Sequence, residues 1–185
     1  QGLSLLELGK HCTEKNLVIS GEAVFETTNH AFSNGCHACE LEIDPETGTI
    51  EIINHALIID AGKIVNPVIV TGQLHGGIAQ GLGQALLEQV VYDSKQGQLL
   101  SGSFLDYTMP RADDLCWFNV GFNEIPSEDN PLGVKGAGDG PTTGSPPAAV
   151  NAVLHALQPL GITHVDMPLT HERIWRYIRK AQDKH

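Results

Sequence analysis

The chain has 185 residues, which is enough for one domain with a hydrophobic core or for two small lobes that share one. Its formal net charge of −11 excludes a typical nucleic-acid-binding protein, because neutralising phosphates requires a surplus of Lys and Arg, and it disfavours attachment to an anionic membrane surface. No apolar run approaches the ~20 residues of a membrane-spanning helix, and four scattered cysteines do not make a disulfide framework. Since residues 1–10 also lack a signal-peptide pattern, we expect a cytoplasmic protein.

The first third of the chain is expected to contain one helix and three strands. Leucine spacing predicts a short helix over 3–15, and residues 17–27 (LVISGEAVFET) have a strand pattern. Residues 36–43 alternate in polarity, 44–48 have turn chemistry, and 49–59 are again rich in β-formers. The last three segments together predict a β-hairpin.

The middle of the chain is expected to run from a loop into a helix and then into two strands. Residues 63–77 (KIVNPVIVTGQLHGG) are interpreted as a loop that contains a proline. The stretch 76–91 has helical spacing of its apolar residues. Residues 98–108 and 116–124 are predicted to form strands.

The last third is expected to contain a long loop and two helices. Residues 125–147 are rich in Pro, Gly, Asp and Ser and are interpreted as a loop. Pro146-Pro147 suits the first turn of a helix whose body follows over 148–157. Thr170 is the predicted N-cap of a helix from 171 to about 182. Its expected buried side consists of Ile174, Trp175 and Ile178. The predicted fold class is α+β with mostly antiparallel strands packed with helices, and residues 1–185 are expected to form a single domain.

A glycine- and glutamine-rich segment over 71–84 is the first candidate site. Interpreted as a loop that enters a helix N-terminus, it offers free backbone N–H groups to an anion. It has neither the dinucleotide-binding glycine spacing nor a Walker lysine. Its amides, Gln73, Gln80 and Gln84, suit the edge of a heterocycle such as a pterin or purine. A tight helix–helix contact with surface glutamines explains the same spacing equally well.

A second glycine-rich segment, 133–144, contains Asp139 on a loop that leads to a helix. A carboxylate in this setting can be a general base, a metal ligand or a turn-former, and the residues alone favour the turn. Cys36 and Cys39 lack a second ligand pair for zinc and are interpreted as packing residues. Of the nine histidines only His75, inside the first segment, attracts attention, and Arg111 can be a structural clamp or an anion contact.

Five segments carry a resemblance to a known family. They are EIDPETG (42–48), DAGKIVNP (60–67), GQLHGGIAQGLGQALLE (72–88), DYTMPRADD (106–114) and GVKGAGDGPTTGSPPAAVNAV (133–153). In this order they resemble the C-terminal portion of molybdenum hydroxylase large subunits, the family of xanthine dehydrogenase, aldehyde oxidase and aerobic carbon monoxide dehydrogenase. The resemblance extends over nearly all of 17–180.

The resemblance implies an oxidoreductase that hydroxylates a heterocycle or aldehyde carbon with oxygen from water. Its cofactor is a molybdopterin with molybdenum, in bacteria often the cytosine dinucleotide form. Electrons leave through Fe–S clusters and FAD on partner subunits or domains. The cofactor-binding residues that the family's motifs imply here are Gln73, Gly76, Gly77, Gln80, Lys135 and Gly138. No residue of this chain is implied as a metal ligand.

Asp139 occupies the position at which the family has a glutamate that acts as general base. Because Asp is one methylene shorter, its carboxyl lies ~1.5 Å short if the backbone is unmoved. The loop can have shifted so that Asp139 still serves as base, the substrate can differ, or the copy can be inactive. The last alternative corresponds to a non-catalytic binding or assembly module. Since the chain lacks an initiator Met and the rest of the cofactor pocket, we expect the C-terminal part of a larger subunit that is inactive alone.

Overall fold

A β-hairpin forms the centre of the molecule. In the computed structural model, which describes residues 2–26 and 29–183, β1 (Asn34–Ile43) pairs antiparallel with β2 (Ile50–Asp60). A bulge between Glu40 and Leu41 shifts the register. The connecting turn is closed by a 2.8 Å hydrogen bond from the Gly48 N–H to the Asp44 carbonyl. The predicted hairpin is therefore confirmed.

The third strand makes the sheet mixed. β3 (Phe118–Phe122) lies parallel to β2, with His55 opposite Phe118 at one end of the paired stretch, and the strand order is β1-β2-β3. The predicted strand over 116–124 is confirmed with shorter bounds. Helices cover the sheet on one side, so the α+β class is confirmed, although one of the two strand pairings is parallel rather than antiparallel.

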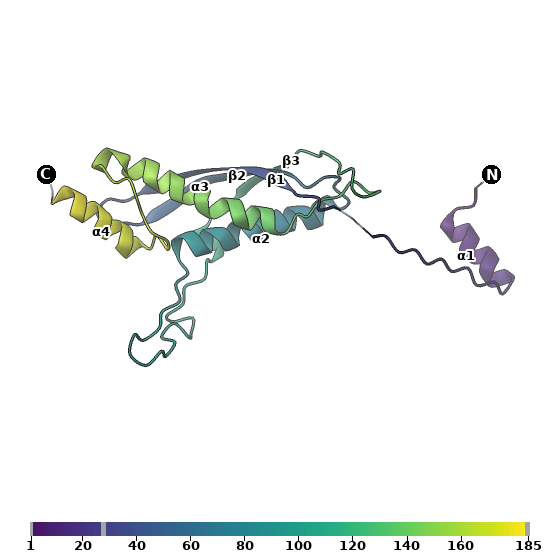
Figure 1. Cartoon of the computed structure of the whole chain (residues 1–185), viewed down its shortest axis with the longest axis horizontal. Coiled ribbons are helices and arrows are strands. Elements are labelled where there is room, and N and C mark those ends of the chain that lie inside the picture. Colours follow the sequence, from purple (N-terminus) through teal and green to yellow (C-terminus); the bar gives the residue numbers. More distant parts are fainter. Residues whose placement is uncertain (1, 27–28, 184–185) are drawn as a thin grey trace.

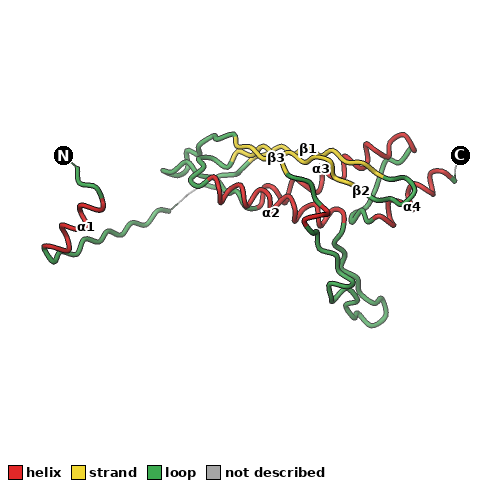
Figure 2. Tube along the Cα trace, turned by 180° about the vertical axis from the view of Figure 1, so that it is seen from behind, coloured by secondary structure: helices red, strands yellow, loops and turns green. Residues whose placement is uncertain are grey.

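Two long helices, α2 (Pro67–Leu86) and α3 (Asp139–Leu157), run side by side along one face of the sheet (Figures 1 and 2). The hydrophobic core fills the space between this helical layer and the inner face of the sheet. Its fully buried members include Leu57, Leu74, Ile78, Leu82, Ala149, Val153 and Ile174.

Helix α2 begins earlier than the sequence pattern indicates. Asn66 is its N-cap and accepts hydrogen bonds from the Val68 and Ile69 N–H groups at 3.1 and 3.3 Å. Pro67 occupies the first helical position, where its missing N–H costs nothing. The predicted loop over 63–77 is thus wrong from Pro67 onward, and the glycines of 71–84 lie inside a helix instead of in a loop before its N-terminus.

Helix α3 also begins earlier than expected. It starts at Asp139, so residues 139–147, predicted to be loop, are helical. Pro146 and Pro147 lie in the helix interior rather than in its first turn, which corrects that prediction. A proline cannot donate to the carbonyl four residues earlier, so the helix lacks two of its internal hydrogen bonds at this point.

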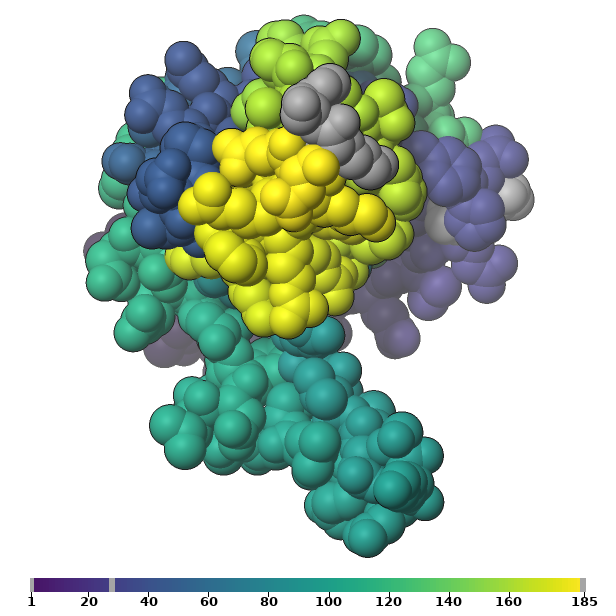
Figure 3. Space-filling model, turned by 90° about the vertical axis from the view of Figure 1, so that its left-hand side faces the viewer, coloured from purple at the N-terminus to yellow at the C-terminus, as the bar shows by residue number. Residues whose placement is uncertain are grey.

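Two predicted strands do not form. Residues 17–26 carry no strand assignment, and Thr27, the end of that prediction, lies outside the described residues. The stretch 98–108 forms only an isolated bridge between Tyr92 and Leu99. The connection from α2 to β3 instead projects from the body as a long loop that ends in a 3-10 turn, Ala112–Asp114 (Figure 3). Strand-forming side chains alone do not make a strand without a partner for the backbone.

The terminal helices differ in how they pack. α1 (Leu5–Glu14), capped by Ser4, has no buried residue and lies apart from the body (Figure 1). A 3-10 turn, Gln158–Leu160, follows α3, and α4 (His171–Gln182) closes the far end of the molecule.

The prediction for α4 is confirmed in its bounds and in its cap. Thr170 accepts a 3.4 Å hydrogen bond from the Arg173 N–H, and Ile174 and Ile178 are buried. Trp175 is 38% exposed and lies against the Gly48 turn. None of the described helices is both long and apolar enough to span a membrane.

Candidate functional site

The glycines of α2 have different surroundings on the two faces of that helix. On the inner face, a Cβ at Gly77 would lie 2.7 Å from Pro141 Cβ, and one at Gly81 would overlap the Ser145 hydroxyl. These two glycines therefore allow α2 and α3 to approach closely. The interpretation of the segment as a helix–helix contact applies to this face.

The outer face of α2 is open. Gln73, Gly76 and Gln80 are exposed there, and nothing lies within 4 Å of the position that a Cβ on Gly76 would take. Gly72 is open in the same way. The outer face thus presents amide side chains beside bare backbone, which a flat polar ligand can approach closely.

The two glycine-rich segments meet at one end of this face. The Gln73 side-chain nitrogen lies 3.9 Å from the position that a Cβ on Gly138 would occupy, and Asp139 follows as the first residue of α3. Gln80 lies two helical turns along α2, about 10 Å further on. The structure therefore brings Gln73, Gly138 and Asp139 together, with Gln80 more distant on the same helix.

Asp139 is exposed, and its backbone carbonyl accepts a 3.0 Å hydrogen bond from the Thr143 hydroxyl. Within residues 2–26 and 29–183 its carboxyl has no hydrogen-bond or ion-pair partner. A negative side chain in the first turn suits the positive end of the helix dipole. The carboxylate is thus available at the surface where the two segments meet.

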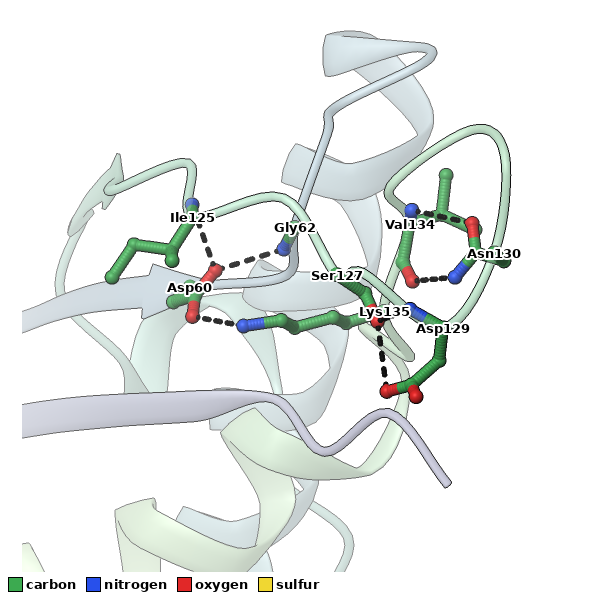
Figure 4. Close-up of polar contacts among 8 residues, drawn as sticks. All are labelled: Asp60, Gly62, Ile125, Ser127, Asp129, Asn130, Val134 and Lys135. Atoms are coloured by element: carbon green, nitrogen blue, oxygen red, sulfur yellow. Dashed lines mark hydrogen bonds and ion pairs between the residues drawn. The ribbon is translucent and has the colours of Figure 1, made fainter. Parts of the chain in front are cut away.

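The loop before α3 is fixed by a buried ion pair (Figure 4). Lys135 Nζ lies 2.6 Å from Asp60 Oδ2 at the end of β2, and both side chains are nearly inaccessible, with exposed fractions of 12% and 8%. The other carboxylate oxygen accepts hydrogen bonds from the Gly62 and Ile125 N–H groups at 2.9 and 3.1 Å. Burial raises the pKa of Asp60, but these hydrogen bonds and Lys135 outweigh it and hold the pKa below its ordinary value.

The Lys135 ammonium is therefore engaged within the protein. Its loop is further closed by a pair of hydrogen bonds between the Asn130 side chain and the Val134 backbone, at 2.9 and 3.0 Å (Figure 4). Lys135 lies at the base of the candidate site and fixes the segment that precedes Gly138.

A pair of histidines lies between the sheet and the first turns of α3. The sequence pattern did not predict this pair. His37 Nδ1 is 3.1 Å from His55 Nε2, and His55 is completely buried. Burial, followed by the charge of His37, lowers the pKa of His55 to about 4, and burial also lowers the pKa of His37. The signal available in the sequence is the alternation of β2, which places His55 on the same face as Leu57 and Ile59.

The remaining candidates do not form a second site. His75 is half-buried and packs edge-on against Trp117, with ring centroids 5.4 Å apart. Cys39 packs against the core and burial raises its pKa to about 11, whereas Cys36 is exposed. Arg111 contacts Asp114 on the surface, at 3.5 Å. In the described part of the chain, no three His, Cys, Asp or Glu side chains are grouped to hold a metal ion.

Comparison with known proteins identifies the family. A family model described as a molybdopterin cofactor-binding domain matches residues 2–116. The chain belongs to this family. The match includes the glycines and glutamines of α2, while Asp139 lies beyond it.

Several relatives match this chain over most of its length. The nicotine 6-hydroxylase large subunit of Paenarthrobacter nicotinovorans is 41% identical over 152 residues, which cover 82% of this chain and 18% of that protein. Quinoline 2-oxidoreductase of Pseudomonas putida 86 superposes with a TM-score of 0.77 at 40% identity, over 80% of this chain and 19% of that one. A Cu,Mo-CO dehydrogenase in the carbon monoxide-reduced state superposes with a TM-score of 0.82 at 30% identity, over 85% of this chain and 20% of that one. The chain thus spans about a fifth of the length of the relatives it matches.

The residues at the candidate site fit a molybdopterin. Gly76 leaves open space beside the α2 backbone, and the exposed Gln73 and Gln80 offer both donors and acceptors to a pterin edge. The start of α3 has no side-chain cap hydrogen bond among the described residues, so the N–H groups of Asp139 and Gly140 in its first turn suit the phosphate of such a cofactor. Gly77 is not available to a ligand in the same way, because it faces α3 instead of the open side of α2.

Proposed function

We propose that this chain is the C-terminal part of the large subunit of a molybdenum hydroxylase, in which it forms one wall of the molybdopterin site and supplies Asp139 as the general base. The observation that carries the proposal is the meeting of Gln73 on α2 with Gly138 and Asp139 at the start of α3. This geometry joins polar amides and a carboxylate that has no partner among the described residues on one accessible surface. On this proposal residues 1–185 count as one domain of that subunit.

The cofactor, when bound, supplies a molybdenum centre that accepts two electrons from the substrate carbon. The chain's own residues hold and orient it. Gln73 and Gln80 donate and accept hydrogen bonds at the pterin edge, and Gly76 and Gly138 leave room for close approach. Gly77 contributes indirectly by setting the distance between α2 and α3, and Lys135 does so by anchoring its loop to Asp60.

Asp139 accepts a proton at a carboxylate oxygen. It extends from the first position of α3, where the backbone is fixed by the helix, so the shorter side chain is not compensated by a mobile loop. We propose that the start of α3 lies close enough to the reacting centre for an aspartate to reach. A non-catalytic module with the same fold is the alternative that the missing methylene supports.

The substrate we propose is a nitrogen-containing aromatic ring. Two relatives with such compounds in their names, nicotine and quinoline, are 41% and 40% identical to this chain, whereas a xanthine dehydrogenase subunit is 32% and the Cu,Mo-CO dehydrogenase 30% identical. This difference favours a ring hydroxylase over a carbon monoxide or aldehyde oxidoreductase.

The assembly we propose contains the remainder of the large subunit together with partners that carry Fe–S clusters and FAD. Support comes from a relative whose name describes a large subunit and from the small share of the relatives that this chain covers. We further propose the cytosine dinucleotide form of the cofactor and a cytoplasmic location, consistent with four cysteines that are all unpaired.

The decisive experiment is metal and pterin analysis of the complete large subunit, purified with its partners, together with turnover of a nitrogen heterocycle by the parent and by Asp139→Asn. We expect molybdenum and pterin in both proteins and a loss of at least ~10²-fold in kcat in the variant. Absence of molybdenum and pterin from the parent would refute the cofactor role. Unchanged turnover in Asp139→Asn would refute the base role and favour the non-catalytic module.

A further inference from the structure

The first turn of α3 rests on the imidazole of His37. An interaction with the backbone of Gly140, the residue directly after Asp139, opposes the lowering of the His37 pKa by burial. One helical turn later, the same ring occupies the space that a Cβ on Gly144 would need. Ile59 and Ser33 complete the support, at 3.2 and 3.6 Å from the position of a Cβ on Gly140.

His55 fixes the orientation of His37. The 3.1 Å contact joins His37 Nδ1 to His55 Nε2, and the other nitrogen of His37, Nε2, lies 2.5 Å from the position that a Cβ on Gly144 would take. The remaining nitrogen, His55 Nδ1, is buried without a hydrogen-bond partner in the described part of the chain. The ring of Phe118, with its centroid 5.9 Å away, holds His55 from the side.

We propose that His37, oriented by His55, is a positioning residue that fixes the first turn of α3 and thereby directs the carboxyl of Asp139. This inference rests on the proposed function, in which Asp139 is the base. The side chain acts through the backbone of Gly140 and does not touch substrate or cofactor. Because the aspartate has no reach to spare, the rate depends on where the helix begins, and a displacement of about 1 Å lowers the rate ~10²-fold.

The test uses the complete large subunit with its partners and compares His37→Leu with His37→Gln. Leucine removes both ring nitrogens, whereas glutamine places a polar amide near the position of Nε2. The matched control is His155→Leu, an exposed histidine near the other end of the same helix. Three quantities are measured: kcat and KM for a heterocyclic substrate, molybdenum and pterin content, and amide hydrogen exchange of peptides from 136–146.

In His37→Leu we expect kcat to fall by ~10- to 100-fold, with KM and cofactor content within about twofold of the parent. Exchange over 136–146 should accelerate, while peptides from α4 stay unchanged. His37→Gln should recover most of both losses, and His155→Leu should match the parent. Parent-like kcat or exchange in His37→Leu overturns the proposal, and so does a leucine defect that glutamine does not recover.

A double variant separates this inference from the proposed function. If His37 acts through Asp139, His37→Leu lowers kcat in the parent but has no further effect in Asp139→Asn. If the fold-losses in kcat of His37→Leu and Asp139→Asn multiply in the double variant, the positioning role is overturned while the base role stands. Unchanged turnover in Asp139→Asn alone means that the proposed function itself has failed.

Gly144→Ala provides a second route if His37→Leu does not assemble. The added methyl displaces the ring without altering either histidine. We expect faster exchange over 136–146 and a lower kcat, although alanine is the better helix former. Parent-like values in this variant overturn the proposal.

Discussion

Lys135 and Asp60, 75 residues apart in the sequence, form an ion pair of 2.6 Å at the base of the segment that leads to Asp139. Asp60 ends β2, so the pair ties the sheet to the loop before α3. Both charges are almost inaccessible to water, and the backbone N–H groups of Gly62 and Ile125 satisfy the other carboxylate oxygen. An intact buried ion pair has a small net effect on stability, but removing one partner is strongly destabilising, because it leaves the other charge buried and uncompensated.

Lys135→Met is therefore expected to lower the free energy of unfolding by about 3–5 kcal/mol, because it leaves the Asp60 carboxylate buried without its counter-charge. The measurement is urea unfolding of the chain at pH 7. Lys63→Met is the matched control, since the Lys63–Glu124 pair, at 3.0 Å, is exposed. Its removal should cost less than about 1 kcal/mol. Equal losses in the two variants would contradict the buried-pair interpretation.

Gly81→Ala is expected to destabilise the chain by roughly 1–3 kcal/mol, because its methyl group would overlap Ser145 and approach Pro146 to 2.8 Å. Gly72→Ala lies in the same helix with open space around it and should instead raise stability by up to about 1 kcal/mol. Thermal unfolding of both variants checks the pair. Shifts of the same sign would show that helix propensity, and not the contact with α3, dominates at position 81.

The stability of the chain should fall as the pH is lowered from about 6.5 toward 4. His55 titrates near 6.5 in the unfolded chain but at about 4 when folded, because burial disfavours its charged form. Its contribution is therefore complete above 6.5 and is lost progressively below, to a total of roughly 3 kcal/mol. Asp60, whose folded pKa is lowered, adds a loss only at still lower pH.

Urea unfolding at pH 7.5, 6.0, 5.0 and 4.5 measures this dependence. His55→Phe should remove most of the slope between 6.5 and 4.5, whereas the exposed His155→Leu should leave it unchanged. A slope that persists in His55→Phe would assign the dependence to other groups.

On the proposed function, Asp139→Glu is expected to retain or exceed the parent kcat in the complete enzyme, because it restores the longer carboxylate side chain that the family resemblance implies at this position. Turnover and its pH profile are measured beside Asp139→Asn. If both substitutions abolish turnover equally while the cofactor stays bound, the site requires the aspartate itself, and the reach argument fails.

Local patterns predicted those parts of the fold that local chemistry determines. The Asp44–Gly48 turn specified the hairpin, and Thr170 specified the start of α4. The start of α2 was missed although Asn66-Pro67 is a strong N-terminal signal, because the glycines that follow were interpreted as loop. Gly77 and Gly81 are tolerated inside a helix since another helix needs the space, a reason that becomes visible only once α3 is in place.

The candidate site depends on contacts that no local pattern contains. Gln73 and Gly138 are brought together by the packing of α2 against α3, and the sequence connected them only through the family resemblance. The His37–His55 pair depends on the register of the hairpin, in which Cys39 and not His37 lies directly opposite His55. Contacts between side chains that lie diagonally across a strand pair cannot be predicted from the spacing of residues in the sequence alone.

The two prolines inside α3 have a mechanical consequence. Pro146 and Pro147 offer no N–H to the carbonyls of Thr142 and Thr143. Two backbone hydrogen bonds that would connect the N-terminal part of the helix to its C-terminal part are therefore missing. The front segment consequently takes its rigidity from lateral supports on the sheet and on α2 rather than from the helix behind it. Substitutions in those supports, many residues away in the sequence, are therefore expected to tilt the Asp139 carboxylate without unfolding the helix. On the proposed function, rate and stability then become separable properties of this domain.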